Sequence, residues 1–257
     1  MKINTFLLPV FLILAACGRG ENQDQTTEQS TLLGTDDSCS NFTRPADGHY
    51  YHCASYPMHD TKGQSTGFRS TLFQISSAFT PEQQKKIARA LDIAMWHVGE
   101  HFIHRYVEKQ ASSDFMNCVA RKNPGELIPV DAPAAIRGKN ATFYAEYAMG
   151  GITILQNFHD FRKVPAKISV LNVPLPTLAQ TPVGKDYSAA GASQNMDIQI
   201  NIQAFIQGVN GQTWSDRGVA GAIFHEWLHR IGFQHLAGQG ANVFINVAGA
   251  CVEFENR

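Results

Sequence analysis

Residues 224–235, FHEWLHRIGFQH, constrain the fold of this chain more than any other stretch, because they place two histidines four residues apart with a glutamate between them. On a helix, residues four apart lie one above the other, so His225 and His229 project from the same side. Glu226 projects one step round the helix from His225. The apolar residues between positions 220 and 231 gather on the opposite side. This predicts that the apolar face packs against the protein core, whereas the histidine face binds a metal ion.

Gly232 and His235 extend this pattern to H-E-x-x-H-x-x-G-x-x-H, with every fixed position filled. A glycine can take the left-handed conformation that turns the chain sharply after a helix, and such a turn can bring His235 beside the first two histidines. Three imidazole ligands leave the fourth position of a tetrahedral zinc ion open to water, as in catalytic zinc sites. We therefore expect one zinc ion bound by His225, His229 and His235, with Glu226 within reach of the water.

This run resembles the signature of the metzincin metallopeptidases, a branch of the zincins. The resemblance implies the same three zinc ligands, makes Glu226 the general base and later the proton donor in peptide-bond hydrolysis, and makes Gly232 the glycine of the turn. A methionine-containing turn after the third histidine is missing, because the last methionine is Met196. No tyrosine follows Tyr187, and few residues follow His235 in a chain of 257. We expect a divergent or minimal metzincin-like domain.

The first 16 residues carry one early positive charge, Lys2, followed by an apolar run and small residues. This order predicts a secretory signal peptide rather than a membrane-spanning helix. Its end, LAAC at positions 14–17, resembles the bacterial lipobox, which implies cleavage before Cys17 and lipidation of that cysteine. The protein would then be anchored in the bacterial cell envelope, at the outer membrane or facing the periplasm. An ordinary signal peptide is the alternative. Residues 17–38 are polar and predict a flexible tether.

Residues 39–257 are long enough for one sizeable domain, which we expect to be the zincin-like catalytic domain. Once Cys17 is assigned to lipid, an even number of cysteines remains in an exported chain, which predicts two disulfides and allows three pairings. The four cysteines are Cys39, Cys53, Cys118 and Cys251. Alternatively, the stretch GHYYHC at 48–53 forms a second metal site or supplies an inhibitory cysteine.

The short tail after His235 has to supply the apolar floor beneath the imidazoles. It offers four apolar residues before a turn-like segment at 248–250, namely Val243, Phe244, Ile245 and Val247. Such a tail would fray unless tethered. We therefore expect a disulfide between Cys118 and Cys251, which leaves Cys39 to pair with Cys53 across a short loop.

Residues 80–83, TPEQ, have the features of a helix start: a threonine cap, a proline in the first turn and a glutamine three residues after the cap. The apolar pattern predicts that this helix continues to about Val107. Within it, residues 97–101 read HVGEH, the inverted zinc motif, and form the rival metal site. Because Glu100 falls opposite the apolar stripe, we expect a solvated or groove-facing flank that carries His97, His101 and His104.

Four strands are expected from the apolar patterns, at 141–148, 152–158, 167–173 and 196–202, with a loop at 174–194 before the last. A long helix, a small sheet and then the active-site helix is the element order of the zincin fold. We therefore expect an α+β, zincin-like fold with a small twisted mixed sheet. By the same resemblance, residues 197–203 form the edge of the cleft and pair with extended substrate, unless they are an ordinary strand facing water.

These features predict a zinc-dependent metalloendopeptidase at the cell envelope, with a peptide or protein as substrate and a membrane anchor at Cys17. The formal net charge of −1 gives no sign of a nucleic-acid partner. The alternative function is a non-enzymatic envelope lipoprotein that binds a protein or cell-wall partner on a zincin scaffold with structural zinc. The missing methionine and tyrosine favour this alternative, whereas Glu226 opposes it, because a structural zinc site does not require that carboxylate.

Overall fold

The computed structural model describes most of the chain from Cys39 to Phe254. The described residues are 39–42, 44–60, 62–122, 133, 136, 138–181, 195–235 and 244–254. The expected signal peptide, the lipidated Cys17 and the tether lie outside them, as do Val243 and most of the loop expected at 174–194. Within the described part, no helix combines the length and hydropathy needed to cross a membrane.

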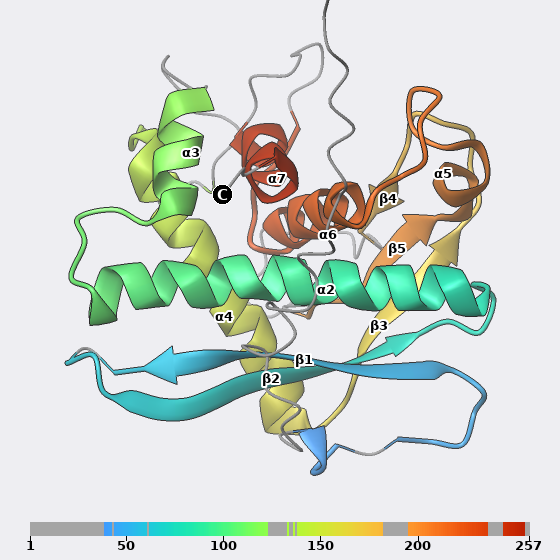
Figure 1. Ribbon diagram of the computed structural model, residues 1–257, viewed down its shortest axis with the longest axis horizontal. Coiled ribbons are helices and arrows are strands. Elements are labelled where there is room, and N and C mark those ends of the chain that lie inside the picture. Colours follow the sequence, from blue (N-terminus) through green and yellow to red (C-terminus); the bar gives the residue numbers. More distant parts are fainter. Residues whose placement is uncertain are drawn as a thin grey trace, which may run out of the picture. The chain divides into compact units, whose positions relative to one another are not determined.

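A mixed five-stranded sheet has the order β1-β2-β3-β5-β4 (Figure 1). The first two strands form an antiparallel hairpin, β3 runs parallel to β2 and to β5, and β4 pairs antiparallel with β5. The bounds are β1 Tyr50–His59, β2 Ser65–Ile75, β3 Ala166–Leu171, β4 Ala179–Gln180 and β5 Ile198–Asn201. The small mixed sheet of an α+β fold is therefore present, and the β1–β2 hairpin is an addition to the expected strands.

The helices pack above this sheet and against one another (Figure 1). Their bounds are α2 Pro81–Phe102, η2 Ile103–Val107, α3 Asp114–Lys122, α4 Ala141–Arg162, α5 Ile202–Gln207, α6 Asp216–Arg230 and α7 Phe244–Phe254. Thr80 caps α2 in a capping box with Gln83, which confirms the predicted start. The helical chain continues through the π-helix η2 to Val107, which confirms the predicted end.

Residues 141–162 form one helix of 22 residues, α4, so the two strands expected at 141–148 and 152–158 are wrong. Asn140 starts the helix, because its side-chain oxygen accepts a hydrogen bond from the backbone N–H of Phe143 at 2.8 Å. Buried side chains then recur at helical spacing and face the core. They include Tyr144, Ala148, Ile152 and Leu155.

Helix α2 lies between the β1–β2 hairpin and α6, and its small residues allow close contact with the sheet (Figure 1). A Cβ atom placed on Gly99 would lie 2.7 Å from the Tyr56 Cβ atom. The Tyr56 hydroxyl in turn donates a 2.6 Å hydrogen bond to Gln156 of α4. On α6, Trp227 stacks on Phe73 of β2 with ring centroids 6.1 Å apart. One core thus fixes α6 against the sheet.

Strands β3 and β5 confirm the two later strands, although each is shorter than expected. Ile198 and Ile200 are fully buried, as the alternating pattern predicts. Asn201 ends the strand because its side chain caps α5, which takes up Ile202 and the following residues. The edge role expected for 197–203 is wrong, because β5 lies between β3 and β4. Strand β4 forms that edge of the sheet instead.

Two disulfides join Cys39 to Cys53 and Cys118 to Cys251, which confirms both predicted pairings. Cys53 is therefore not a metal ligand or an inhibitory thiol. The tail after His235 folds differently from the expectation, because 248–250 lie inside helix α7 and do not form a turn. The close packing of α7 on α6 explains this, since small residues at these positions suit a helix–helix contact.

Candidate metal centre

Helix α6 carries the first part of the histidine motif and ends where the sequence predicts. Ser215 caps its start by accepting a hydrogen bond from the backbone N–H of Gly218 at 3.0 Å. The helix ends at Arg230, and Gly232 takes the left-handed conformation with φ 99°. This turn sends the chain back across the end of α6, where the Phe233 N–H donates to the Leu228 carbonyl at 3.1 Å.

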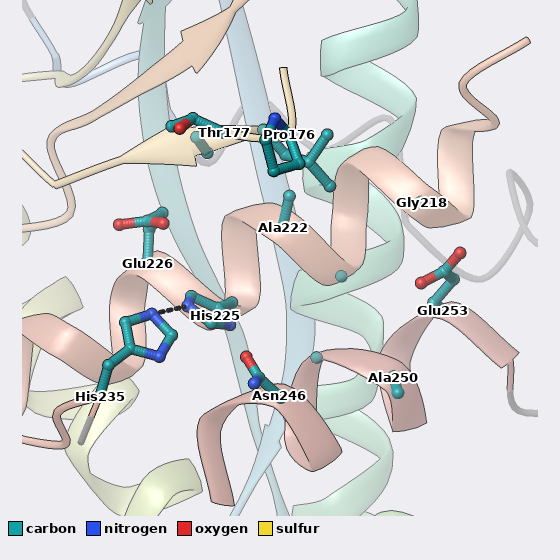
Figure 2. A pocket seen from close by; sticks show the side chains of 14 residues that line it. Pro176, Thr177, Gly218, Ala222, His225, Glu226, His235, Asn246, Ala250 and Glu253 are labelled. Carbon is teal, nitrogen blue, oxygen red and sulfur yellow. Dashed lines mark hydrogen bonds between the residues drawn. The ribbon is translucent and has the colours of Figure 1, made fainter. Parts of the chain in front are cut away.

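The three histidines of the motif come together at one point. One ring nitrogen from each of His225, His229 and His235 lies within 4.8 Å of the other two. The Nε2 atoms of His225 and His235 are 3.1 Å apart and face each other (Figure 2). Two nitrogens bound to one tetrahedral zinc ion would be about 3.3 Å apart, given Zn–N distances of about 2.0–2.1 Å. The three imidazoles therefore fit a zinc ion.

Burial also favours the protonation state that a metal requires. Desolvation is the largest cause that lowers the pKa of His225, and together with the neighbouring His229 and His235 it brings that pKa to about 3. Desolvation is likewise the main cause that lowers the pKa values of His229 and His235. At neutral pH the three rings are therefore neutral, which is the form in which histidine binds a metal.

Backbone carbonyl groups orient two of these rings. The Nδ1–H of His229 donates to the Phe233 carbonyl at 2.9 Å, just after the glycine turn. The ring of His225 makes a hydrogen bond to the backbone of Ile245 in α7. Such bonds fix the tautomer and leave the other ring nitrogen for the metal. Sequence reasoning missed both partners, because a backbone carbonyl carries no residue-specific signal.

Glu226 lies beside the histidines and is held by a residue that the sequence did not identify. The Thr181 hydroxyl donates to Oε2 of Glu226 at 2.6 Å, and it also lies 3.1 Å from the Glu226 backbone carbonyl. Burial raises the pKa of the Glu226 carboxyl, and the hydrogen bonds from Thr181 oppose this effect. Thr181 follows β4 directly and is itself buried. The end of strand β4 thus places a hydroxyl group beside Glu226 of helix α6.

A cleft of about 430 Å³ opens onto this cluster (Figure 2). Its walls come from the segment at 176–179 that leads into β4, from α6 and from α7. His225, Glu226 and His235 all line it. Since a substrate in this cleft would touch the histidines and the carboxylate together, the site has the arrangement that hydrolytic chemistry requires.

Helix α7 provides the apolar support expected beneath the imidazoles. Phe244, Ile245 and Val247 are buried, as predicted for a floor, although they form helical turns. Phe244 packs on Phe233 with ring centroids 4.6 Å apart, next to the turn that carries His235. The last turn of α7 is joined to α3 through Cys251.

The inverted motif at 97–101 does not assemble a metal site from its own residues. His97 and His101 are only 5% and 1% exposed, so the expected solvated flank is wrong. The physical reason is that α2 is covered by β1 on one side and by α6 on the other. His101 instead shares a 2.8 Å hydrogen bond with the Ser113 hydroxyl and lies 3.5 Å from a Glu146 oxygen.

A second group of possible ligands contains only part of that motif. Glu100, His104 and Asp114 place one ligand atom each within 4.8 Å of the others, with Asp114 exposed. The Asp114 backbone N–H donates to Nδ1 of His104 at 3.3 Å, which already uses one of the two ring nitrogens. The cluster at 225–235 is therefore the better metal centre. No protein-family model, curated protein or solved structure matches this chain.

Proposed function

We propose that this chain is a zinc-dependent metalloendopeptidase of the metzincin-like, zincin type. The observation that carries the proposal is the convergence of His225, His229 and His235, with ligand nitrogens within 4.8 Å of one another. Glu226 lines the same cleft as two of these histidines. A ligand set of three neutral imidazoles with an adjacent carboxylate suits a hydrolytic zinc site better than a closed structural one.

The arrangement of elements supports the zincin-like part of the proposal. Long helix α2, strands β3 to β5 and helix α6 follow one another in the expected order, although the β1–β2 hairpin precedes α2. Strand β4 lies at the end of the sheet, antiparallel to β5, and the segment that leads into it lines the cleft. An extended peptide can add to such an edge through main-chain hydrogen bonds, so β4 takes the role first expected for 197–203.

The chain's own residues account for the proton transfers of peptide hydrolysis. A zinc ion held by the three imidazoles would polarise a carbonyl group and lower the pKa of a water molecule. Glu226 removes a proton from the attacking water and later delivers it to the leaving amine. The 2.6 Å hydrogen bond from Thr181 holds one carboxylate oxygen, which restricts the rotation of the base.

The proposed location is the bacterial cell envelope, with the lipidated Cys17 as the membrane anchor. The support comes from the LAAC sequence at 14–17 and from the two disulfides, which are typical of exported proteins. Partitioning of the protein into detergent tests this part. Cys17→Ser is expected to release the protein from membranes or to block its processing.

Metal analysis and peptide turnover on the full-length protein test the proposed activity. We expect one zinc ion per chain and cleavage of a mixed peptide library, read by mass spectrometry. Glu226→Gln should keep the zinc and lose about 10²–10⁴-fold of the hydrolysis, the usual contribution of general-base catalysis. His104→Ala is the matched control, because it removes a histidine outside the proposed ligand set.

The same experiment separates the two functions suggested by the sequence. Zinc retention without any cleavage by the parent protein would favour the non-enzymatic binding protein with a structural zinc. Absence of zinc from the parent protein would contradict both the peptidase and the binding protein with structural zinc. Equal zinc content after His235→Ala would also contradict both functions.

A further inference from the structure

A groove leads away from the histidine cluster between α6 and α7. On α6 the groove is lined at helical spacing by Gly218, Gly221, Ala222 and His225. On α7 it is lined at the same spacing by Asn246, Gly249, Ala250 and Glu253. The two helices run antiparallel, because Gly221 approaches both Gly249 and Glu253, whereas Gly249 also approaches His225.

Most of the residues that line this groove between His225 and Glu253 are glycine or alanine. From His225 to Gly218 the groove extends for about 10 Å, at a rise of about 1.5 Å per helical residue. Gly221 and Gly249 let the two backbones touch at the floor of the groove, since a Cβ on Gly221 would lie 2.8 Å from the Gly249 oxygen. The small lining residues between His225 and Glu253 leave space above this floor for a long side chain of a bound peptide.

Glu253 closes the end of the groove that lies away from the histidines (Figure 2). Its carboxyl is partly buried, and desolvation raises its pKa while Lys122 opposes the rise. Lys122 does not line the cleft, and among the described residues no cation forms an ion pair with Glu253. Glu253 is the charged side chain of the described lining at this end, so the end of the cleft away from the histidines carries negative charge.

From this geometry we propose that the groove between α6 and α7 is a subsite for a lysine or arginine side chain of the substrate, and that Glu253 recognises the positive charge. This inference rests on the proposed peptidase function and names the substrate class of its cleft. A lysine carries its ammonium group on a flexible four-carbon stem, which suits a groove with a carboxylate at its far end. A desolvated carboxylate without a partner gains a charge-assisted hydrogen bond when such a group binds.

Peptide binding tests the subsite without requiring hydrolysis. Labelled Ala/Gly peptides that contain a single lysine, norleucine or glutamate are titrated by fluorescence anisotropy against full-length, zinc-loaded Glu226→Gln protein. We expect the lysine peptide to bind about 10- to 100-fold more tightly than the norleucine peptide, the range of a hydrogen bond to a charged group. Adding Glu253→Gln should abolish this preference, and adding Glu253→Lys should favour the glutamate peptide. Adding Glu82→Gln, an exposed glutamate at the start of α2, is the matched control.

Equal affinity for the three peptides, or a lysine preference that survives Glu253→Gln, would overturn the subsite. A parallel digestion with Glu226 intact separates this result from the proposed activity. Peptide cleavage without a basic residue at a fixed position beside the cut contradicts the subsite alone. A lysine preference in binding without cleavage of any peptide contradicts the hydrolysis alone.

Discussion

Thr181 and Glu226 are joined by a 2.6 Å hydrogen bond that connects the end of the sheet's edge strand to helix α6. Thr181 is buried, so water has little access to replace its hydroxyl group as the donor. The carboxylate proposed as the base is therefore positioned by the same strand that is proposed to bind the peptide. Substrate bound along β4 would influence the position of the base.

Thr181→Val is expected to slow hydrolysis about tenfold or more, because a hydrogen bond to a charged group is worth about 1.5–3 kcal/mol. The valine keeps the size of the side chain and removes only the donor. Thr181→Ser keeps the donor and should retain most of the turnover. Steady-state kinetics with zinc analysis checks this, and KM should change less than kcat. Equal kcat values for the valine and serine variants would show that Thr181 does not position Glu226.

Removing the Cys118–Cys251 disulfide is expected to destabilise the fold more than removing Cys39–Cys53. The first bridge spans 133 residues and the second spans 14. In the loop-entropy model their stabilising effects are about 5 and about 3 kcal/mol. Urea unfolding of the two double-serine variants measures the difference. Only Cys118→Ser/Cys251→Ser should also weaken zinc retention, because α7 supports the imidazoles. Equal zinc retention in the two double-serine variants would contradict this supporting role of α7.

Gly221→Ala is expected to lower the melting temperature and to weaken zinc binding. The added Cβ would lie 2.8 Å from the Gly249 oxygen and 3.2 Å from the Glu253 Cβ, so α7 has to move away from α6. Gly150→Ala is the control, because nothing lies within 4 Å of its added Cβ on helix α4. That change should be neutral or stabilise by about 0.5–1 kcal/mol. Thermal unfolding in the presence and absence of zinc compares the Gly221→Ala and Gly150→Ala variants. A stable Gly221→Ala protein with normal zinc affinity would refute the close contact between α6 and α7.

Glu253→Gln is expected to make the protein more stable at neutral pH but not in acid. Burial raises the folded-state pKa of Glu253 above its ordinary value of 4.5. The folded protein then binds the proton more tightly than the unfolded chain, so stability is greatest below the unfolded pKa and falls as the pH rises through the folded pKa. Melting temperatures of parent and variant from pH 3.5 to 7 measure this. Equal curves throughout that range would mean that the carboxylate is not desolvated.

The parts of the fold that could be predicted from the sequence are those with local causes. Spacing alone places His225 and His229 on one helical face, and Gly232 marks the turn that returns His235. The capping box at Thr80 likewise depends on neighbouring residues only. The cysteine pairing was predicted from the position of Cys251, since the residues after the histidine motif were expected to need a covalent anchor.

The errors arose where distant contacts decide the structure. Residues 141–162 are rich in aromatic and β-branched side chains and contain Gly150 and Gly151, a pattern that also suits two strands. Contacts with distant residues favour the helix instead. Gly151, for example, lies so close to the Ile231 side chain that a larger residue would not fit. The β1–β2 hairpin did leave a local signal, because Asp60 accepts hydrogen bonds from the N–H groups of Lys62 and Gln64 in the connecting turn. Thr181 left none, because β4 is only two residues long.

The bridge between Cys118 and Cys251 encloses the proposed zinc ligands and the proposed base in one covalent ring. Thr181, Glu226 and the three histidines all lie between its two ends. If the protein cuts its own chain once within this ring, the two fragments stay attached, and a non-reducing gel shows a single band. Under reducing conditions they separate. Self-digestion would therefore go unnoticed unless samples are reduced, and a nicked molecule would still hold its helices near one another.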